Sequence, residues 1–475
     1  MTDSRPDLVL VMTDQHRHDQ VGWFPGSPVR TPTLDRLAAD GVVFDACYSS
    51  STTCVPARTS LLTGRLDHRV ATGTNRALVP GTPTVARMLR DAGYQTALVG
   101  KMHFTPMRAD HGFDHLEVAE HFTAYPGDPA SWDGYDHYHD WLAERGLPDW
   151  RFEVPGGTAA PYPFPPDTHP TAWVRDRAVE VLPRRAPARP PLLVVSFPHP
   201  PPPPNPPEPY ASLYDPADSA VDPDDAHRND GLPHLFRLEL EADGPDHRRV
   251  RAERLDHHRR ELALTHGSIT QIDDAVATVV DHLDLDRTLV WFTADHGDYG
   301  GRRGLVRKVP WIPFDDLARV PCFATGGPVS GGRRIASPVQ SYDWVPTALA
   351  AAGLTMPYPD ADPGDGQSQL GLLTGPAATG DDDRVVLSAF TMHWPMARRG
   401  RFKYIRELGW SEEVLFDLEA DPDETTNLAG RPEAEEVRAE LSAAVDEELS
   451  GSTIRADLDA ALAAAMANQP EAPRA

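Results

Sequence analysis

Hydrophobic residues in the first 300 positions form short apolar runs that alternate with amphipathic segments. The runs are rich in β-branched residues and too short for helices, so each predicts a buried strand. They cover residues 8–12, 42–44, 96–99, 192–197 and 288–293. Helical patterns lie between them, the longest over 261–283. Buried strands separated by helices are typical of an α/β sheet that helices cover on both faces.

Two helices near the start of the chain have the same boundary residues. A Thr-Pro pair precedes each, at 31–32 and 82–83, and a glycine follows each, at Gly41 and Gly93. Threonine can cap the free amides, and proline suits the first helical position. We expect both glycines to be left-handed residues just past the last turn.

The periodic pattern is lost in segments 105–190 and 205–258, which we interpret as insertions above the sheet. Nine of the twelve residues from 198 to 209 are proline, which predicts an extended polyproline stretch. Further on, strands are expected at 384–390, 401–406 and 414–417, and a helical tail at 432–466. We therefore predict an α/β domain over 1–378 and a small C-terminal α+β subdomain over 379–475.

The chain of 475 residues has 45 basic and 71 acidic side chains, a formal charge of −26. This balance argues against nonspecific nucleic-acid binding, which requires a basic surface. No segment approaches the roughly 20 apolar residues that span a bilayer. The run at 8–12 is also too short for a signal peptide. We expect a cytoplasmic protein with neither a nucleic-acid nor a membrane partner.

Three cysteines are too few for a disulfide framework in a chain of this length. Cys47 and Cys322 lie beside strand-like apolar residues and are expected to be inert buried thiols. Cys54 remains as the candidate for special chemistry.

Polar residues gather where the predicted strands end. Functional groups of α/β sheets collect at the carboxyl ends of the strands, so these five positions together predict a site. They are Asp14-Gln15, Cys54 to Arg58, Lys101 to His103, His199, and Asp295-His296.

Cys54 opens a Cys-x-Pro-x-Arg motif that ends at Arg58 and is followed by Leu62-Thr63-Gly64-Arg65. With this motif the chain resembles the type I, formylglycine-dependent sulfatases of the alkaline phosphatase superfamily. Gly100-Lys101-Met102-His103, Asp295-His296-Gly297-Asp298 and Lys308 follow in the order such enzymes show, and the resemblance extends to Leu428. It implies an alkaline-phosphatase-like mixed sheet flanked by helices. It also implies that a formylglycine-generating enzyme converts Cys54 to Cα-formylglycine.

The pairs Asp14-Gln15 and Asp295-His296 look most like those of choline-sulfatase-type and phosphonate-monoesterase-type members. Typical arylsulfatases have Asp-Asp and Asp-Asn at these places. The residues therefore leave open which ester the enzyme cleaves.

A hydrated aldehyde at position 54 has one oxygen to attack sulfur or phosphorus and a second whose deprotonation expels the product anion. The attacking oxygen needs a metal to lower its pKa. The expected ligands are Asp14, Gln15, Cys54, Asp295 and His296. The family favours Ca²⁺, and one imidazole among oxygens also suits Mn²⁺.

Three cations are expected to bind anionic oxygens. Arg58 can hold the diol or its oxyanion through its planar fork, while Lys101 and Lys308 suit the oxygens of a tetrahedral anion. Only three of the 45 basic residues are lysine, so two lysines at motif positions indicate a need for an ammonium group. The third, Lys403, is expected to be structural.

Two imidazoles are assigned to proton transfer. The resemblance favours His103 beside the diol and His199 toward the leaving group, and Asn75 is a further candidate substrate donor.

Other notable residues have simpler interpretations. The pairs His16 with His18 and His257 with His258 could suggest a second metal site, but their spacing favours solvated surface. Six aromatic residues interleaved with aspartates could form a cage for a quaternary ammonium, but packing of the insertion is the preferred interpretation. They are Tyr125, Trp132, Tyr135, Tyr138, Trp141 and Trp150.

We therefore expect a metal-dependent sulfatase that acts on a small soluble ester. A phosphonate monoester or phosphodiester hydrolase on the same site is the first alternative. A non-catalytic binding module with unmodified Cys54 is the second, and a sulfuryl or phosphoryl transferase is a third. The resemblance also implies assembly into homo-oligomers through the C-terminal tail.

Overall fold

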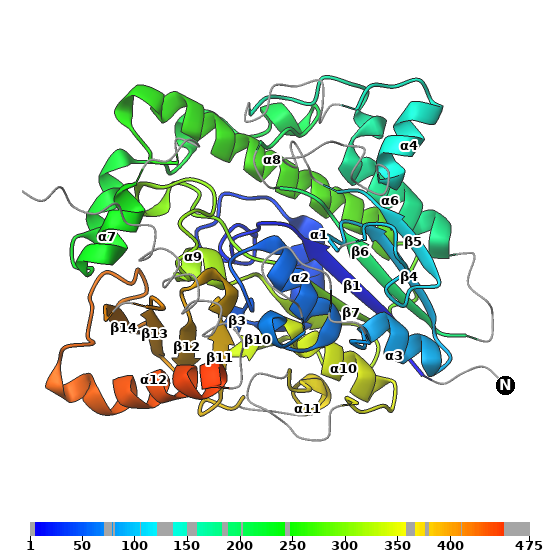
Figure 1. Cartoon of the computed structure of the whole chain (residues 1–475). Helices are drawn as coiled ribbons and strands as arrows, with labels where there is room; N and C mark the ends of the chain where they lie inside the picture. Colours follow the sequence, from blue (N-terminus) through cyan, green and yellow to red (C-terminus); the bar gives the residue numbers. More distant parts are fainter. Residues whose placement is uncertain are drawn as a thin grey trace, which may run out of the picture.

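The computed structural model describes residues 5–70, 78, 81–104, 106–120, 136–149, 159–182, 189–200, 203–242, 248–357, 366–375, 380–409 and 411–450. Within these residues, eight strands form one sheet in the order β5-β4-β6-β1-β7-β8-β2-β9 (Figure 1). The strands are β1 (Asp7–Thr13), β2 (Val42–Phe44), β4 (Gln95–Gly100), β5 (His115–Val118), β6 (Pro191–Ser196), β7 (Thr288–Ala294), β8 (Phe323–Thr325) and β9 (Arg333–Ile335). The first five strands in this order, which are β5, β4, β6, β1 and β7, run parallel, whereas β8 is antiparallel to both its neighbours. The expected mixed α/β sheet is confirmed.

Helices cover both faces of the sheet (Figure 1). Leu8 and Leu10 of β1 pack in one apolar cluster with residues of α2, α3 and α10. Val9 and Val11 pack in another with residues of α1, α4, α6 and α8. This double burial explains why the strand is an unbroken apolar run. The helices are α1 (Pro32–Asp40), α2 (Cys54–Thr63), α3 (Val85–Asp91), α4 (His137–Glu144), α6 (Pro170–Val181), α8 (Leu255–Val280) and α10 (Trp344–Ala351).

The helix boundaries agree only in part with the sequence. Gly93 has φ +95° and is left-handed as expected. Gly41 is extended at φ −113°, so that expectation was wrong. A Cβ at Gly41 would lie 2.3 Å from the carbonyl oxygen of Ala324 in β8, and glycine serves close approach here. α3 begins two residues later than expected, after Thr84, whose hydroxyl accepts the N–H of Arg87.

Segment 105–190 is more regular than its sequence suggested, because it holds β5, α4 and α6. Shorter elements complete the part of the chain before residue 380. They are β3 (Cys47–Tyr48), α7 (His234–Glu241), α9 (Asp315–Ala318), β10 (Val339–Gln340) and α11 (Leu370–Thr374). The described residues contain no helix with the length and apolar character needed to cross a membrane.

Four antiparallel strands and one helix follow towards the C-terminus (Figure 1). They are β11 (Val385–Ser388), β12 (Met396–Arg399), β13 (Phe402–Arg406), β14 (Glu413–Asp417) and α12 (Glu435–Ser450). The sequence did not indicate β12, because two of its four residues are arginine. The expected tail beyond residue 450 lies outside the described residues. The domain boundary at 378 and oligomerisation through the tail stay predictions.

A buried polar group joins the C-terminal sheet to α9 and β3. The Nζ of Lys403 in β13, which is fully buried, lies 2.8 Å from both Asp315 Oδ1 and Glu424 Oε1. The backbone N–H of Asp315 donates to Glu424 Oε2 (2.7 Å), and the Tyr48 hydroxyl donates to Asp315 Oδ1 (2.8 Å). Tyr48 ends β3 shortly before Cys54, and Asp315 opens α9 shortly after Lys308. One ammonium group therefore helps to hold two segments of the site.

Replacing Lys403 with methionine should remove the cation that Asp315 and Glu424 share. These acids would keep the longer ion pairs to Arg319 (3.6 Å) and Arg303 (3.7 Å). We expect the free energy of unfolding to fall by about 3–5 kcal/mol, measured by urea unfolding. Arg401→Met is the matched control, because Arg401 is 47% exposed and its pair with Asp417 spans 3.4 Å. It should cost at most about 1 kcal/mol. Equal effects of the two substitutions would contradict the assignment.

Candidate active site

The register of β1 and β7 brings two acidic residues together. Thr13 pairs with Ala294, so Asp14 and Asp295 follow at adjacent positions. The backbone N–H of Asp295 donates to the Thr13 carbonyl (3.1 Å), and that of Gln15 donates to Asp295 Oδ1 (2.9 Å). Both carboxylates are fully buried. Charges buried in this way require compensating partners.

Arg58 lies between the two carboxylates. This side chain of α2 is 1% exposed, and it donates to Asp295 Oδ2 (2.8 Å) and Asp14 Oδ2 (3.1 Å). Its remaining nitrogen donates to the Lys101 carbonyl (2.7 Å) and Ser196 Oγ (2.8 Å). The guanidinium thus ties the ends of β1, β4, β6 and β7 to α2.

Lys101, directly after β4, adds a second cation. Its Nζ lies 2.6 Å from Asp14 Oδ2. Burial raises the pKa of Asp14, but Lys101, Arg58 and neighbouring cations lower it further, and the net pKa falls well below its usual range. Burial and the adjacent Asp14 raise the pKa of Asp295. Of two carboxylates that share a site, one has its pKa raised by the charge of the other, and added positive charge would favour the ionised form of both.

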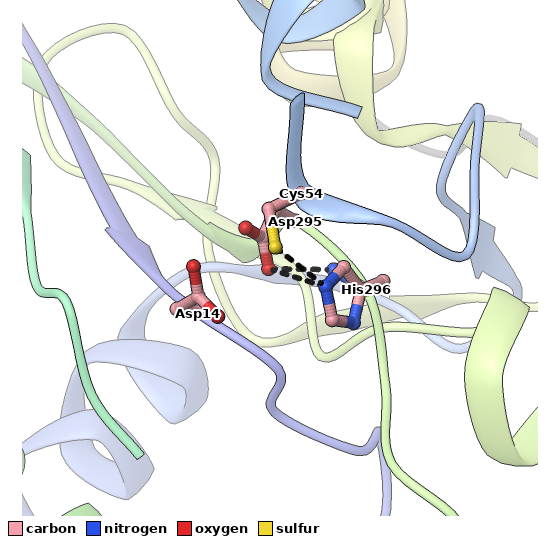
Figure 2. Close-up of side chains that lie close together, drawn as sticks. All are labelled: Asp14, Cys54, Asp295 and His296. Atoms are coloured by element: carbon pink, nitrogen blue, oxygen red, sulfur yellow. Dashed lines mark hydrogen bonds and ion pairs between the residues drawn. The ribbon is translucent and has the colours of Figure 1, made fainter. Parts of the chain in front are cut away.

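Cys54 is the first residue of α2 and faces these groups (Figure 2). Its Sγ lies 2.9 Å from Lys308 Nζ and 3.5 Å from His296 Nε2. Burial and Asp14 raise the pKa of the thiol, but Lys308, Lys101 and a hydrogen bond from His103 bring it well below its usual value. The surroundings of residue 54 therefore stabilise negative charge.

The donor set fits a divalent cation. One ligand atom each from Asp14, Cys54, Asp295 and His296 lies within 4.8 Å of the others. Asp14 Oδ1 is buried and has no hydrogen-bond partner among the described residues. His296 Nδ1 lies 2.9 Å from the Gly297 carbonyl and must donate to it, so in the neutral ring Nε2 has a lone pair. A buried orphan acceptor beside an imidazole lone pair suits a metal.

Gln15, the other expected ligand, follows β1 at φ +48°. Its side-chain Nε2 donates to Asp298 Oδ2. This contact fixes the amide nitrogen against Asp298 and leaves the amide oxygen as the atom that could coordinate a cation.

The two candidate proton carriers lie on different loops. The backbone N–H of His103 donates to Glu120 Oε1 (2.7 Å), and its φ is +67°. His199 follows β6, and its Nε2 lies 3.0 Å from Asn205 Oδ1. Burial lowers the pKa of His199 to about 4, although the hydrogen bond to Asn205 raises it.

The structure thus brings together seven predicted residues, namely Asp14, Cys54, Arg58, Lys101, Asp295, His296 and Lys308. Gln15, His103 and His199 each form a hydrogen bond to a residue of this group. Asn75 lies outside the described residues. Sequence reasoning missed four residues that hold the site, namely Glu120, Ser196, Asn205 and Asp298. Asp298 had a signal in the Asp295-His296-Gly297-Asp298 run, and Asn205 had one as the single non-proline from Pro200 to Pro207. Glu120 and Ser196 had none.

Several simpler interpretations can also be checked. Cys47 and Cys322 are buried as expected. The histidine pairs were expected to be solvated, which is wrong for His16 and His258, both of which are buried. His257 and His258 lie on α8 with Glu261, and these three could hold a metal. However, Arg307 Nε already pairs with that carboxylate at 3.2 Å.

The aromatic insertion is described in part. Tyr138 stacks on Trp141 and meets Trp173 of α6 edge to face, which agrees with packing. Tyr125, Trp132, Tyr135 and Trp150 lie outside the described residues.

Comparison with known proteins agrees with this site. The sulfatase family model matches residues 6–354. The chain is 30% identical to a choline-sulfatase of Rhizobium meliloti, covering 93% of this chain and 86% of that one. It is 29% identical to an arylsulfatase of Clostridium perfringens, covering 94% and 95%.

Solved structures show the same fold. A phosphonate monoester hydrolase from Silicibacter pomeroyi superimposes with a TM-score of 0.74 at 22% identity, covering 94% of this chain and 96% of that one. With most of the chain matched by the family model, the protein belongs to the sulfatase family and is a sulfuric ester hydrolase.

Proposed function

We propose that this protein hydrolyses the sulfate ester of a small molecule through a Cα-formylglycine at position 54 and a divalent metal ion. One observation carries the proposal. Residue 54 shares a group of donor atoms with Asp14, Asp295 and His296, and it also lies 2.9 Å from the ammonium of Lys308. A nucleophile in this place meets both a cation-binding group and a positive charge for a tetrahedral anion.

The aldehyde at position 54, hydrated to a geminal diol, supplies one oxygen to attack sulfur and a second whose deprotonation expels sulfate. A thiol or a serine has no second hydroxyl and cannot release sulfate in this way. A formylglycine-generating enzyme is therefore a required partner during maturation.

The other residues follow from their positions. Arg58 holds Asp14 and Asp295 together, since its hydrogen bonds already go to both. Lys101 and Lys308 bind the non-bridging oxygens of the ester as point charges. His103 takes the proton of the second hydroxyl, and His199, in the imidazolium form that the nearby Asp14 favours, gives a proton to the leaving oxygen.

Asp14, Gln15, Asp295 and His296 would hold the metal. When bound, the ion lowers the pKa of a hydroxyl and neutralises developing negative charge. Oxygen donors with one imidazole fit Ca²⁺, which the family favours, and also Mn²⁺.

Hydrolysis of phosphonate monoesters or phosphodiesters is the second candidate function. The pairs Asp14-Gln15 and Asp295-His296 favour it, because they resemble those of phosphonate-monoesterase-type members as well as choline-sulfatase-type ones. A phosphorus ester is also a tetrahedral anion and makes the same demands on the two lysines.

Residue 54 itself gives a direct test of the proposed function. Protein produced with a formylglycine-generating enzyme should lack sulfur at this position by peptide mass spectrometry. Cys54→Ala should lower hydrolysis of aryl or choline sulfate by at least about 10⁴-fold. Cys322→Ala is the control for loss of a buried thiol and should change activity only a few-fold.

Full activity with an intact thiol at position 54 would contradict the proposal. Turnover of phosphonate or phosphodiester substrates alone would select the second candidate function. Absence of turnover with any ester, despite the modification, would favour a binding module.

The metal site gives an independent test of the proposed function. Asp295→Asn removes a charged ligand, so we expect loss of one equivalent of bound ion by elemental analysis and a fall in kcat of at least about 10²-fold. Asp176→Asn, at an exposed acid, should change neither quantity. Dialysis against a chelator should inactivate the native enzyme, and added Ca²⁺ or Mn²⁺ should restore it. Unchanged metal content in Asp295→Asn would exclude this ligand set.

A further inference from the structure

A short proline-rich segment approaches His199 in the fold. We call residues 203–209 the proline strap, and residues 203–207 within it are buried. Asn205 lies between Pro204 and Pro206. A residue that precedes proline is restricted to extended conformations, so the backbone of Asn205 has little freedom. The sequence thus presents this one amide side chain from a stiff support.

The strap is held against the body of the protein. The backbone N–H of Tyr162 donates to the Pro206 carbonyl (3.1 Å). Tyr210, just after the strap, lies over Gly267 in the middle of α8. A Cβ at Gly267 would lie 2.3 Å from the Tyr210 carbonyl oxygen and 3.4 Å from Pro206 Cγ. Glycine in a helix interior is destabilising, and here it allows the strap to seat closely.

The buried amide of Asn205 contacts His199. Its Oδ1 lies 3.0 Å from His199 Nε2, and the side chain is 5% exposed. An amide oxygen can only accept, so Nε2 carries the hydrogen. The amide nitrogen of Asn205 has no hydrogen-bond partner within the part of the chain that is described. Within the described residues, the contact with His199 is therefore the interaction that orients the Asn205 amide.

A second imidazole covers the ring of His199. The rings of His169 and His199 have centroids 4.6 Å apart. The backbone N–H of Thr171 donates to His169 Nδ1 (3.1 Å), and the Gln271 amide lies 3.2 Å from the same atom. His169 is thereby held in place by its own neighbours and packs against the ring of His199. The contact that bears on the tautomer of His199 is the one with Asn205.

We propose that Asn205 is a positioning residue that keeps His199 protonated at Nε2, so that Nδ1 is the nitrogen that exchanges a proton with the leaving oxygen of the ester. When the ester bond to sulfur breaks, the proton on Nδ1 of the imidazolium forms the O–H bond of the released alcohol, and the neutral Nε2–H tautomer remains. This inference rests on the role proposed above for His199.

Leaving-group dependence tests the proposal. Asn205→Leu keeps the approximate shape but removes the acceptor, and Asn205→Asp keeps an acceptor oxygen. General acid catalysis matters most for poor leaving groups and contributes about 10²–10⁴-fold. We expect Asn205→Leu to lower kcat for phenyl sulfate by about 10²-fold and for 4-nitrophenyl sulfate by less than about 10-fold, with little change in KM. Asn205→Asp should recover most of the loss.

Asn229→Leu is the matched control, because Asn229 is a buried asparagine whose amide donates to the Arg303 carbonyl (3.1 Å). It should show no leaving-group dependence. An equal loss for both sulfates in Asn205→Leu, with unchanged metal content, would overturn the positioning role.

A measurement without substrate separates this inference from the proposed function. ¹⁵N spectra of the imidazoles, with the His199 signals identified through His199→Gln, should show the Nε2–H tautomer in the native protein and a mixture of tautomers in Asn205→Leu. A native Nδ1–H tautomer would overturn the inference even in an active enzyme. Absence of all sulfatase activity would overturn the function and leave the tautomer assignment standing.

Discussion

The register between β1 and β7 is the constraint on which the site depends. It places two carboxylates at adjacent positions inside the protein, where each would be too costly without positive charge. The side chains around the two carboxylates compensate that negative charge. Arg58 bridges the pair, Lys101 neutralises one member, and one oxygen of Asp14 remains for a cation. The helix that carries Arg58 also carries Cys54 four residues earlier, so neutralising the acids also positions residue 54.

A second buried polar group supports the same region from outside. Lys403 contacts two acids, and one of them, Asp315, comes shortly after Lys308 in the sequence. Asp315 also accepts a hydrogen bond from Tyr48, which comes shortly before Cys54. The C-terminal sheet therefore contributes to the site without supplying any of the predicted catalytic residues. This arrangement links the stability of the small sheet to the geometry around residue 54.

The sequence predicted much of the sheet, because its central strands are buried on both faces and read as continuous apolar runs. It also predicted which strand-end residues would lie together, because a single polar residue there is commonly a loop residue or a helix cap, whereas five such strand ends in one sheet point to a common place. It did not predict β12, whose arginines hide the pattern, or the extended conformation of Gly41, which a carbonyl in a distant strand imposes. Contacts such as those of Glu120 and Ser196 depend on which strands become neighbours, and no local pattern encodes that order.

The distance along the chain between Cys54 and two side chains that contact its thiol has a consequence for biosynthesis. His296 and Lys308 follow the cysteine by 242 and 254 residues. At a synthesis rate of about 5–20 residues per second, the ribosome needs roughly 13–50 s to add the lysine after the cysteine. During that interval the residues from the second half of the chain that contact the thiol have not all been synthesised. A maturation enzyme working on the nascent polypeptide would meet an open peptide segment rather than a closed pocket.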